Sequence, residues 1–218
     1  MMICLAGLVS FLLVLTAEAQ VGLTDENSLC KDTEQCLQHT TICNNTIYEV
    51  RRYESVKWVC TSFSAPNWML GVGPAFWRVY NYLKDNNMGM STSPGTVQKP
   101  ADAPPNSWFS KFVNNPKLAN LIPKMPEYTL CFLLPIEHQN NPPEPTDAKV
   151  EIVETEQRYV YVRAYNGSLT DESDQAKLLF NSINKKSYEN ARINALYNRP
   201  SMTQYIEVWV EANSTAQC

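Results

Sequence analysis

The chain has 218 residues, which is enough for one sizeable domain and short for two. Its 18 Lys and Arg residues and 22 Asp and Glu residues give a formal net charge of −4, and they form no basic run or basic-aromatic array. This charge distribution argues against nucleic acid as a partner.

The first residues are typical of a secretory leader. Residues 3–15 are largely apolar and are followed by the small-x-small triplet Ala17-Glu18-Ala19. We predict a signal peptide over residues 1–19, a mature chain that starts near Gln20, and a secreted, extracellular protein. The alternative, an uncleaved anchor helix, needs about 20 apolar residues to span a bilayer, and this run is shorter. No later stretch approaches a membrane span.

Removal of the leader leaves an even number of cysteines, which in an oxidising compartment indicates disulfides. These disulfide candidates are Cys30, Cys36, Cys43, Cys60, Cys131 and Cys218. Six thiols allow about 15 connectivities, and the sequence does not choose among them. No C-x-x-C pair is present and the first cysteines are widely spaced, so a zinc site is not expected. Three sequons make Asn44, Asn166 and Asn213 candidate glycosylation sites.

The mature chain begins with a polar segment and then becomes strand-like. Residues 20–46 carry cysteines but no clean periodicity, so we predict an N-terminal extension held by disulfides. Residues 47–63 contain two runs rich in aromatic and β-branched residues on either side of Glu54 and Ser55. We predict a β-hairpin that turns at these two residues.

A helix is predicted after a loop at residues 64–71. The segment 73–84 places apolar residues at i, i+3, i+4 and i+7, with Pro74 tolerated in the first turn. This stripe consists of Phe76, Val79, Tyr80 and Leu83. Residues 88–126 hold many prolines and are predicted to be a long connection. A continuously apolar strand follows at residues 128–134, and then a second proline-rich loop.

The order of elements then repeats. Residues 149–167 contain two strand-like runs about a Glu-rich turn, and residues 171–184 place a second apolar stripe at helical spacing. Its members are Ala176, Leu179, Phe180 and Ile183. Residues 204–211 form the predicted closing strand. Two hairpin-helix-strand units would place two helices against a curved sheet, so we predict an α+β fold with a barrel-like sheet.

Several segments in this order resemble the SOUL heme-binding protein family, most closely its heme-binding protein 2-like members. They read YEVRRYESVKWVCTSF, AFWRVYNYL, MGMSTSPGTV, YTLCFLLP, PPEPTDAKVEIVETEQRYVYVRAYNG and IEVWV. The resemblance covers residues 47–211 and gives a SOUL-like domain over residues 47–212, with a C-terminal tail at 213–218. It implies a distorted β-barrel built from two pseudo-repeated units with two helices. It also implies non-enzymatic binding of heme or a related tetrapyrrole, which the protein would carry or sequester.

The resemblance also implies where such a ligand would bind. In the family, the apolar face of the first helix and an M-x-M-T-x-P-V loop line the proposed pocket. The matching candidates here are Phe76, Val79, Tyr80, Leu83, Met88 and Met90. Some members carry a histidine, proposed as an axial ligand, where this chain has Arg52. An arginine cannot donate a lone pair to iron, although it can pair with a propionate, so Arg52 is a further candidate. An arginine found on the first helix of other members is replaced by Gly73.

Each of these candidates has a structural alternative. The helix stripe also fits ordinary core packing, and methionine often fills irregular apolar gaps. The histidines, His39 and His138, are expected to be solvated loop residues. Arg51 and Arg52 are adjacent, so at most one of them points into the sheet interior. No Cys-His or Ser-His-acid set supports catalysis, and the alternative function is an extracellular interaction protein that has lost heme binding.

Overall fold

The computed structural model describes residues 21–23, 35–88, 95–99, 125–168, 171–184, 192–197 and 204–218. The predicted signal peptide and the candidates Cys30 and Met90 lie outside these residues. Within the described part, two helices accompany two antiparallel sheets, which confirms the α+β class. None of the described helices is long and apolar enough to cross a membrane.

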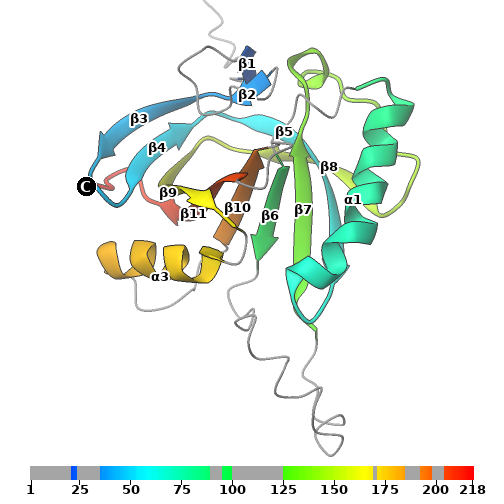
Figure 1. The fold of residues 1–218 in the computed structure, drawn as a ribbon. Coiled ribbons are helices and arrows are strands. Elements are labelled where there is room, and N and C mark those ends of the chain that lie inside the picture. The colour runs from blue at the N-terminus through cyan, green and yellow to red at the C-terminus, as the bar shows by residue number, and fades with distance from the viewer. Residues whose placement is uncertain are drawn as a thin grey trace, which may run out of the picture.

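The larger sheet has nine strands in the order β3-β4-β9-β11-β10-β6-β7-β5-β8 (Figure 1). Its strands are β3 (His39–Asn44), β4 (Glu49–Tyr53), β5 (Val56–Ser64), β6 (Gly95–Lys99), β7 (Glu127–Leu133), β8 (Val150–Thr155), β9 (Arg158–Gly167), β10 (Arg192–Tyr197) and β11 (Gln204–Ala212). A two-stranded sheet pairs β1 (Val21–Leu23) with β2 (Gln35–Leu37). The long helices are α1 (Trp68–Asp85) and α3 (Glu172–Ser182), and a short 3-10 turn, η3, covers Ile136–His138.

The two predicted hairpins are wrong, because β4 does not pair with β5, nor β8 with β9. Instead the run β4-β5 pairs along its length with the run β8-β9, from Glu49 opposite Val162 to Thr61 opposite Val150. The register is the same on both sides of the breaks between the strands. Two-residue hairpin turns favour residues that accept positive φ, such as Gly and Asn, and neither break supplies one. Each run therefore continues across its break, and the two halves of the sequence pair with each other.

The sheet is strongly curved (Figure 1), but the predicted distorted β-barrel is not confirmed. The strand order of the described residues has two ends, β3 and β8. The runs β4-β5 and β8-β9 each contribute one strand near either end of this order. Strands β4 and β9 lie near the β3 end, and β5 and β8 lie at the β8 end. Helix α1 packs on β5, β7 and β8, and α3 packs on β9 and β11 (Figure 1).

Helix α1 begins earlier than predicted. It starts at Trp68, where the side chain of Asn67 caps it by accepting the Leu70 N–H at 3.0 Å. Pro74 consequently lies inside the helix rather than in its first turn. At Gly71 the helix approaches β5 so closely that a Cβ would overlap the ring of Phe63 and lie 2.7 Å from the Cβ of Ala65, just after the strand.

Three further segments carry strands that the sequence did not predict. Strand β6 lies within the predicted connection at 88–126, and β10 pairs with both β6 and β11. In the predicted extension, β3 joins the main sheet, and Cys36 and Leu37 of β2 are buried against Trp58 and Leu133. The described residues 35–44 are therefore part of the fold.

Buried residues form three clusters. One lies between α1 and the sheet, and a second lies between α3 and β9-β11. The central cluster contains Tyr53, Trp58, Tyr205 and Trp209 and belongs to the opposite face of the sheet. Because β11 is covered on both faces, Tyr205 to Val210 are all buried.

Disulfides connect distant parts of the chain. Cys43 at the end of β3 bonds to Cys218, and their Cα atoms are 5.9 Å apart. Cys60 on β5 bonds to Cys131, its direct partner on β7, with Cα atoms 4.1 Å apart. Cys36 is also disulfide-bonded. Five of the six candidate cysteines are therefore paired, and Cys30 lies outside the described residues.

Candidate functional site

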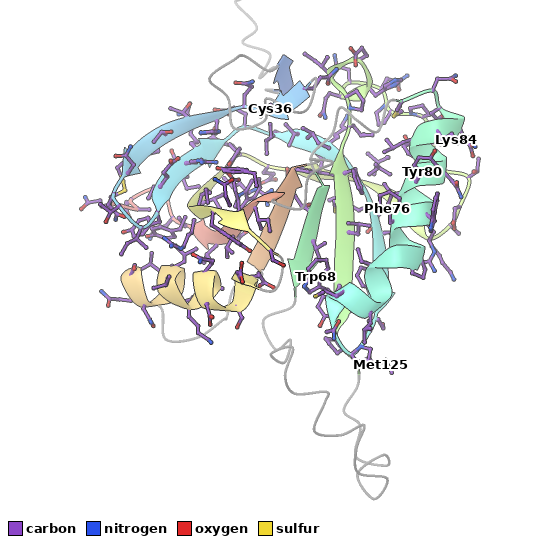
Figure 2. The ribbon with its side chains drawn as sticks, in the orientation of Figure 1. Cys36, Trp68, Phe76, Tyr80, Lys84 and Met125 are labelled. Carbon is purple, nitrogen blue, oxygen red and sulfur yellow. A yellow bond between two sulfur atoms is a disulfide. The ribbon has the colours of Figure 1, made fainter. Side chains whose placement is uncertain are left out.

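One flank of α1 presents a set of aromatic rings beside the sheet. The rings of Phe76 and Tyr80 stack with a centroid separation of 6.1 Å and an interplanar angle of 10°. Phe76 also meets Phe132 of β7 edge to face at 6.0 Å, so this flank is turned toward β7 (Figure 2). Trp77 packs against Tyr80 at 5.2 Å and is 58 % exposed. The flank therefore combines flat apolar surface with access to solvent.

The remaining helix candidates lie deeper. Val79 and Leu83 are fully buried in the cluster between α1 and the sheet, and Met88 is 6 % exposed in the same cluster. Their burial fits core packing and leaves them beneath the aromatic flank. Of the predicted stripe, Phe76 and Tyr80 are thus the half-buried members. The buried face of α1 is centred instead on Ala75, Val79, Tyr82 and Leu83.

Groups that could serve a heme are present on this flank. Lys84 is exposed one turn beyond Tyr80 and lies in the last turn of the helix, where a cation is also favourable (Figure 2). An ammonium there can pair with a propionate, and the parallel rings of Phe76 and Tyr80 can contact the flat face of a tetrapyrrole. The described residues of this flank therefore fit a planar ligand that carries carboxylates.

The adjacent arginines point to opposite faces of β4, as predicted. Arg52 forms an ion pair with Glu54 at 3.1 Å, and its side chain is 36 % exposed. It lies on β4, whose partners are β3 and β9, and Figure 1 shows β4 apart from α1. The structure therefore does not bring Arg52 together with the helix candidates.

Arg51 instead belongs to a buried ionic cluster that the sequence did not predict. Its Nη1 donates to Glu207 Oε1 at 2.8 Å and to the Tyr53 hydroxyl at 3.2 Å, and its Nε pairs with Glu49 Oε2 at 2.7 Å. Burial alone would lower the pKa of Arg51, but Glu207 and Tyr53 raise it above its ordinary value. The guanidinium is therefore charged although it is 1 % exposed.

Glu207 is fully buried at the centre of this cluster. Besides Arg51, it accepts hydrogen bonds from the Tyr205 hydroxyl at 3.1 Å and from Trp209 Nε1 at 2.7 Å. Burial, followed by the carboxylate of Glu207, raises the pKa of Tyr205 above its ordinary value, so the phenol stays a donor. The alternation of β11, with a glutamate between two aromatic residues, was the available signal for this arrangement.

The histidines do not form a metal site in the described part of the chain. His39 lies on β3, not in a loop as predicted, and its ring is 5.5 Å from that of Tyr53. Burial, together with the charge of Arg51, lowers its pKa below the ordinary value. His138 lies in η3, and no group of three or more His, Cys, Asp or Glu among the described residues is placed to hold a metal ion.

Two polar cavities flank the proline-rich loop that precedes β8. One has a volume of about 360 Å³ and lies between this loop and α1. The other has a volume of about 570 Å³ and lies on the side of Lys57 and Ile152. The residues that line these two cavities include none of the predicted heme contacts.

Comparison with known proteins gives consistent relationships. A family model described as SOUL heme-binding protein matches residues 34–211. Heme-binding protein 2 from Homo sapiens is 25% identical over 175 residues, which are 75% of this chain and 77% of that protein. Heme-binding protein 2 from Mus musculus is 25% identical over 137 residues, 61% of this chain and 58% of that protein.

Among solved structures, the fold is similar to that in the cryo-EM structure of the EcmrR-DNA complex in EcmrR-RPo. The TM-score is 0.52 at 8% sequence identity, over 76% of this chain and 57% of that chain. This likeness concerns the fold alone.

Proposed function

This chain belongs to the SOUL heme-binding protein family, and from that membership we propose that it binds heme or a related tetrapyrrole. It carries or sequesters this ligand and does not transform it. A planar tetrapyrrole needs an apolar surface for its ring and cations or backbone donors for its propionates. We place the ligand on the aromatic flank of α1, defined by Phe76, Trp77 and Tyr80.

The stacked, half-buried pair Phe76 and Tyr80 is the observation that carries this proposal. Two nearly parallel rings offer a flat apolar surface against which a porphyrin can pack. Each such aromatic contact contributes about 0.5–1.5 kcal/mol to the binding free energy beyond the effect of the buried area. Lys84 supplies the cation for a propionate. Val79, Leu83 and Met88 support the flank from below, so their role in the site is to hold its shape.

Titration with hemin, followed by the Soret band, tests the proposal. The mature protein should give a saturable shift at one equivalent. The double variant Phe76→Ala/Tyr80→Ala should bind at least about tenfold more weakly, since two aromatic contacts are lost.

Two control variants distinguish binding at this flank from binding elsewhere on the protein. Leu70→Ala removes an apolar side chain that is 64 % exposed on the same helix, so unchanged affinity argues against nonspecific adsorption to α1. Arg52→Ala tests the propionate contact expected from the sequence, and we expect no effect because Arg52 lies away from the flank. Equal binding by wild type and the Phe76/Tyr80 double variant would contradict the proposed site.

We further propose that the protein acts outside the cell. The disulfides Cys43–Cys218 and Cys60–Cys131 are stable in an oxidising compartment, which supports this location. All three sequon asparagines are exposed, and the Thr215 hydroxyl lies 3.0 Å from the Asn213 side-chain oxygen. Expression in a secretory cell line should yield protein in the medium whose mass falls after enzymatic deglycosylation. Retention of the unmodified chain in the cytosol would contradict this proposal.

A second candidate function is favoured by exposed apolar residues on α1. Met69, Leu70 and Trp77, all on α1, are 44 %, 64 % and 58 % exposed, and apolar side chains that are exposed together on one surface element are found at protein interfaces. If micromolar hemin produces no Soret shift, an extracellular interaction protein on this scaffold becomes the favoured function.

A further inference from the structure

The smaller polar cavity lies on the flank of α1 away from Phe76 and Tyr80. Helix residues Arg78, Tyr82 and Asp85 line one side of it, and these positions lie roughly opposite residues 76 and 80 on a helical projection. Residues 144–147 of the loop that precedes β8 form the other side, and Figure 1 shows this connection between β7 and β8 passing beside α1.

The loop is held firmly against the helix. The Tyr82 hydroxyl donates to the Pro143 carbonyl at 2.8 Å. Three of the six residues from 142 to 147 are prolines, each of which fixes its own φ angle. At the end of the loop, the Asp147 carboxylate accepts the Lys149 N–H at 2.9 Å, and the Asp147 carbonyl accepts the Val150 N–H at 2.9 Å. The cavity wall is therefore preorganised.

Charges of both signs face this cavity without neutralising one another. Its lining residues include one cation, Arg78, and three acidic residues, Asp85, Glu144 and Asp147. Among the described residues, none of these carboxylates lies within the 4.0 Å of the Arg78 guanidinium that defines an ion pair. The cation and the anions are thus spaced apart around a shared volume of about 360 Å³, near the lower end of the range for ligand pockets.

We propose that this cavity binds a small zwitterion of the amino-acid class, independently of any tetrapyrrole on the other flank. The ligand carboxylate pairs with the planar fork of Arg78, and the ammonium lies between Glu144 and Asp147. Because three carboxylates and one guanidinium line the cavity, its net charge of −2 disfavours acidic ligands and favours a basic side chain.

Calorimetric titration of the mature protein with four small molecules tests this proposal. L-arginine should bind with a Kd of about 1 mM or tighter, L-alanine more weakly, and L-glutamate least of all. Agmatine, which is arginine without its carboxylate, should bind at least about tenfold more weakly than L-arginine because it cannot pair with Arg78. This comparison uses the unaltered protein, so it does not depend on how any variant folds.

Variants assign the contacts. Arg78→Gln keeps most of the side-chain stem and should weaken L-arginine binding at least about tenfold. The same variant should not weaken agmatine binding, because it removes a positive charge from the cavity. Glu144→Gln should weaken both ligands. Lys57→Ala is the matched control, because Lys57 lines only the larger cavity on the other side of the loop. This variant should bind L-arginine like the wild type. Absence of saturable L-arginine binding, or equal affinities for L-arginine and agmatine, would overturn the proposal.

Discussion

Replacing Arg51 by methionine should destabilise the protein far more than the same change at the next residue. Arg51→Met retains much of the side-chain volume but removes the cation that faces Glu207 at 2.8 Å. Glu207 is fully buried, so its charge would lose its main partner without gaining water. Removing one member of a buried ion pair typically costs about 3–5 kcal/mol.

The expected loss lies toward the lower end of this range. After the substitution, Glu207 still accepts hydrogen bonds from Tyr205 at 3.1 Å and from Trp209 at 2.7 Å. Hydrogen bonds to a charged group contribute about 1.5–3 kcal/mol each, so the carboxylate keeps part of its stabilisation. A loss of about 3 kcal/mol corresponds to a fall in melting temperature of about 6–12 °C for a domain of this size.

Urea unfolding, followed by tryptophan fluorescence with the disulfides intact, measures this loss directly. Arg52→Met is the matched control, since Arg52 pairs with Glu54 near the surface and such pairs contribute about 0–1 kcal/mol. The midpoint should fall strongly for Arg51→Met and little for Arg52→Met, with similar slopes for both. Equal losses in the two variants would refute the assignment of Arg51 as the buried partner.

Three further predictions test the packing, the crosslinks and the charge environment. Gly71→Ala should lose about 1–3 kcal/mol of unfolding free energy because its Cβ would overlap β5, whereas Gly73→Ala, whose Cβ meets nothing within 4 Å, should lose nothing and gain up to about 1 kcal/mol. Replacing both Cys60 and Cys131 by serine should lower the unfolding free energy by about 2–5 kcal/mol, measured by urea titration against wild type, and an unchanged value would contradict the crosslink. The pKa of His39 lies below 6.5 in the folded state, so its stabilising contribution is complete above pH 6.5 and declines as the pH falls below it. NMR titration of the His39 ring should show this lowered pKa, and His39→Gln should flatten the dependence of stability on pH in that range.

The sequence predicted local elements better than their partners. The stripe of α3 was identified correctly, because Ala176, Leu179 and Phe180 are buried at helical spacing. The start of α1 was missed because glycines and a proline obscured a helix that Asn67 caps. A capping residue before an apolar run is therefore a usable signal even when glycine follows.

Long-range pairing could not be inferred from local pattern. The strand-like composition of these segments is compatible with pairing between neighbours in the sequence. It is equally compatible with the observed pairing to strands about 100 residues away. The burial of Glu207 likewise depends on Arg51, which is 156 residues distant. At the candidate heme site, periodicity identified Phe76 and Tyr80 but could not separate them from the buried Val79.

The location of the tetrapyrrole is the central claim, and amide NMR spectra recorded during addition of hemin test it most directly. The paramagnetic iron broadens signals from nearby residues. The account predicts that broadening begins at residues 76–84 of α1 and at Phe132 of β7, while Arg51, Arg52 and Glu207 remain sharp. Broadening centred on β4 and β11, or no broadening at one equivalent of hemin, would contradict a heme site on this flank of α1.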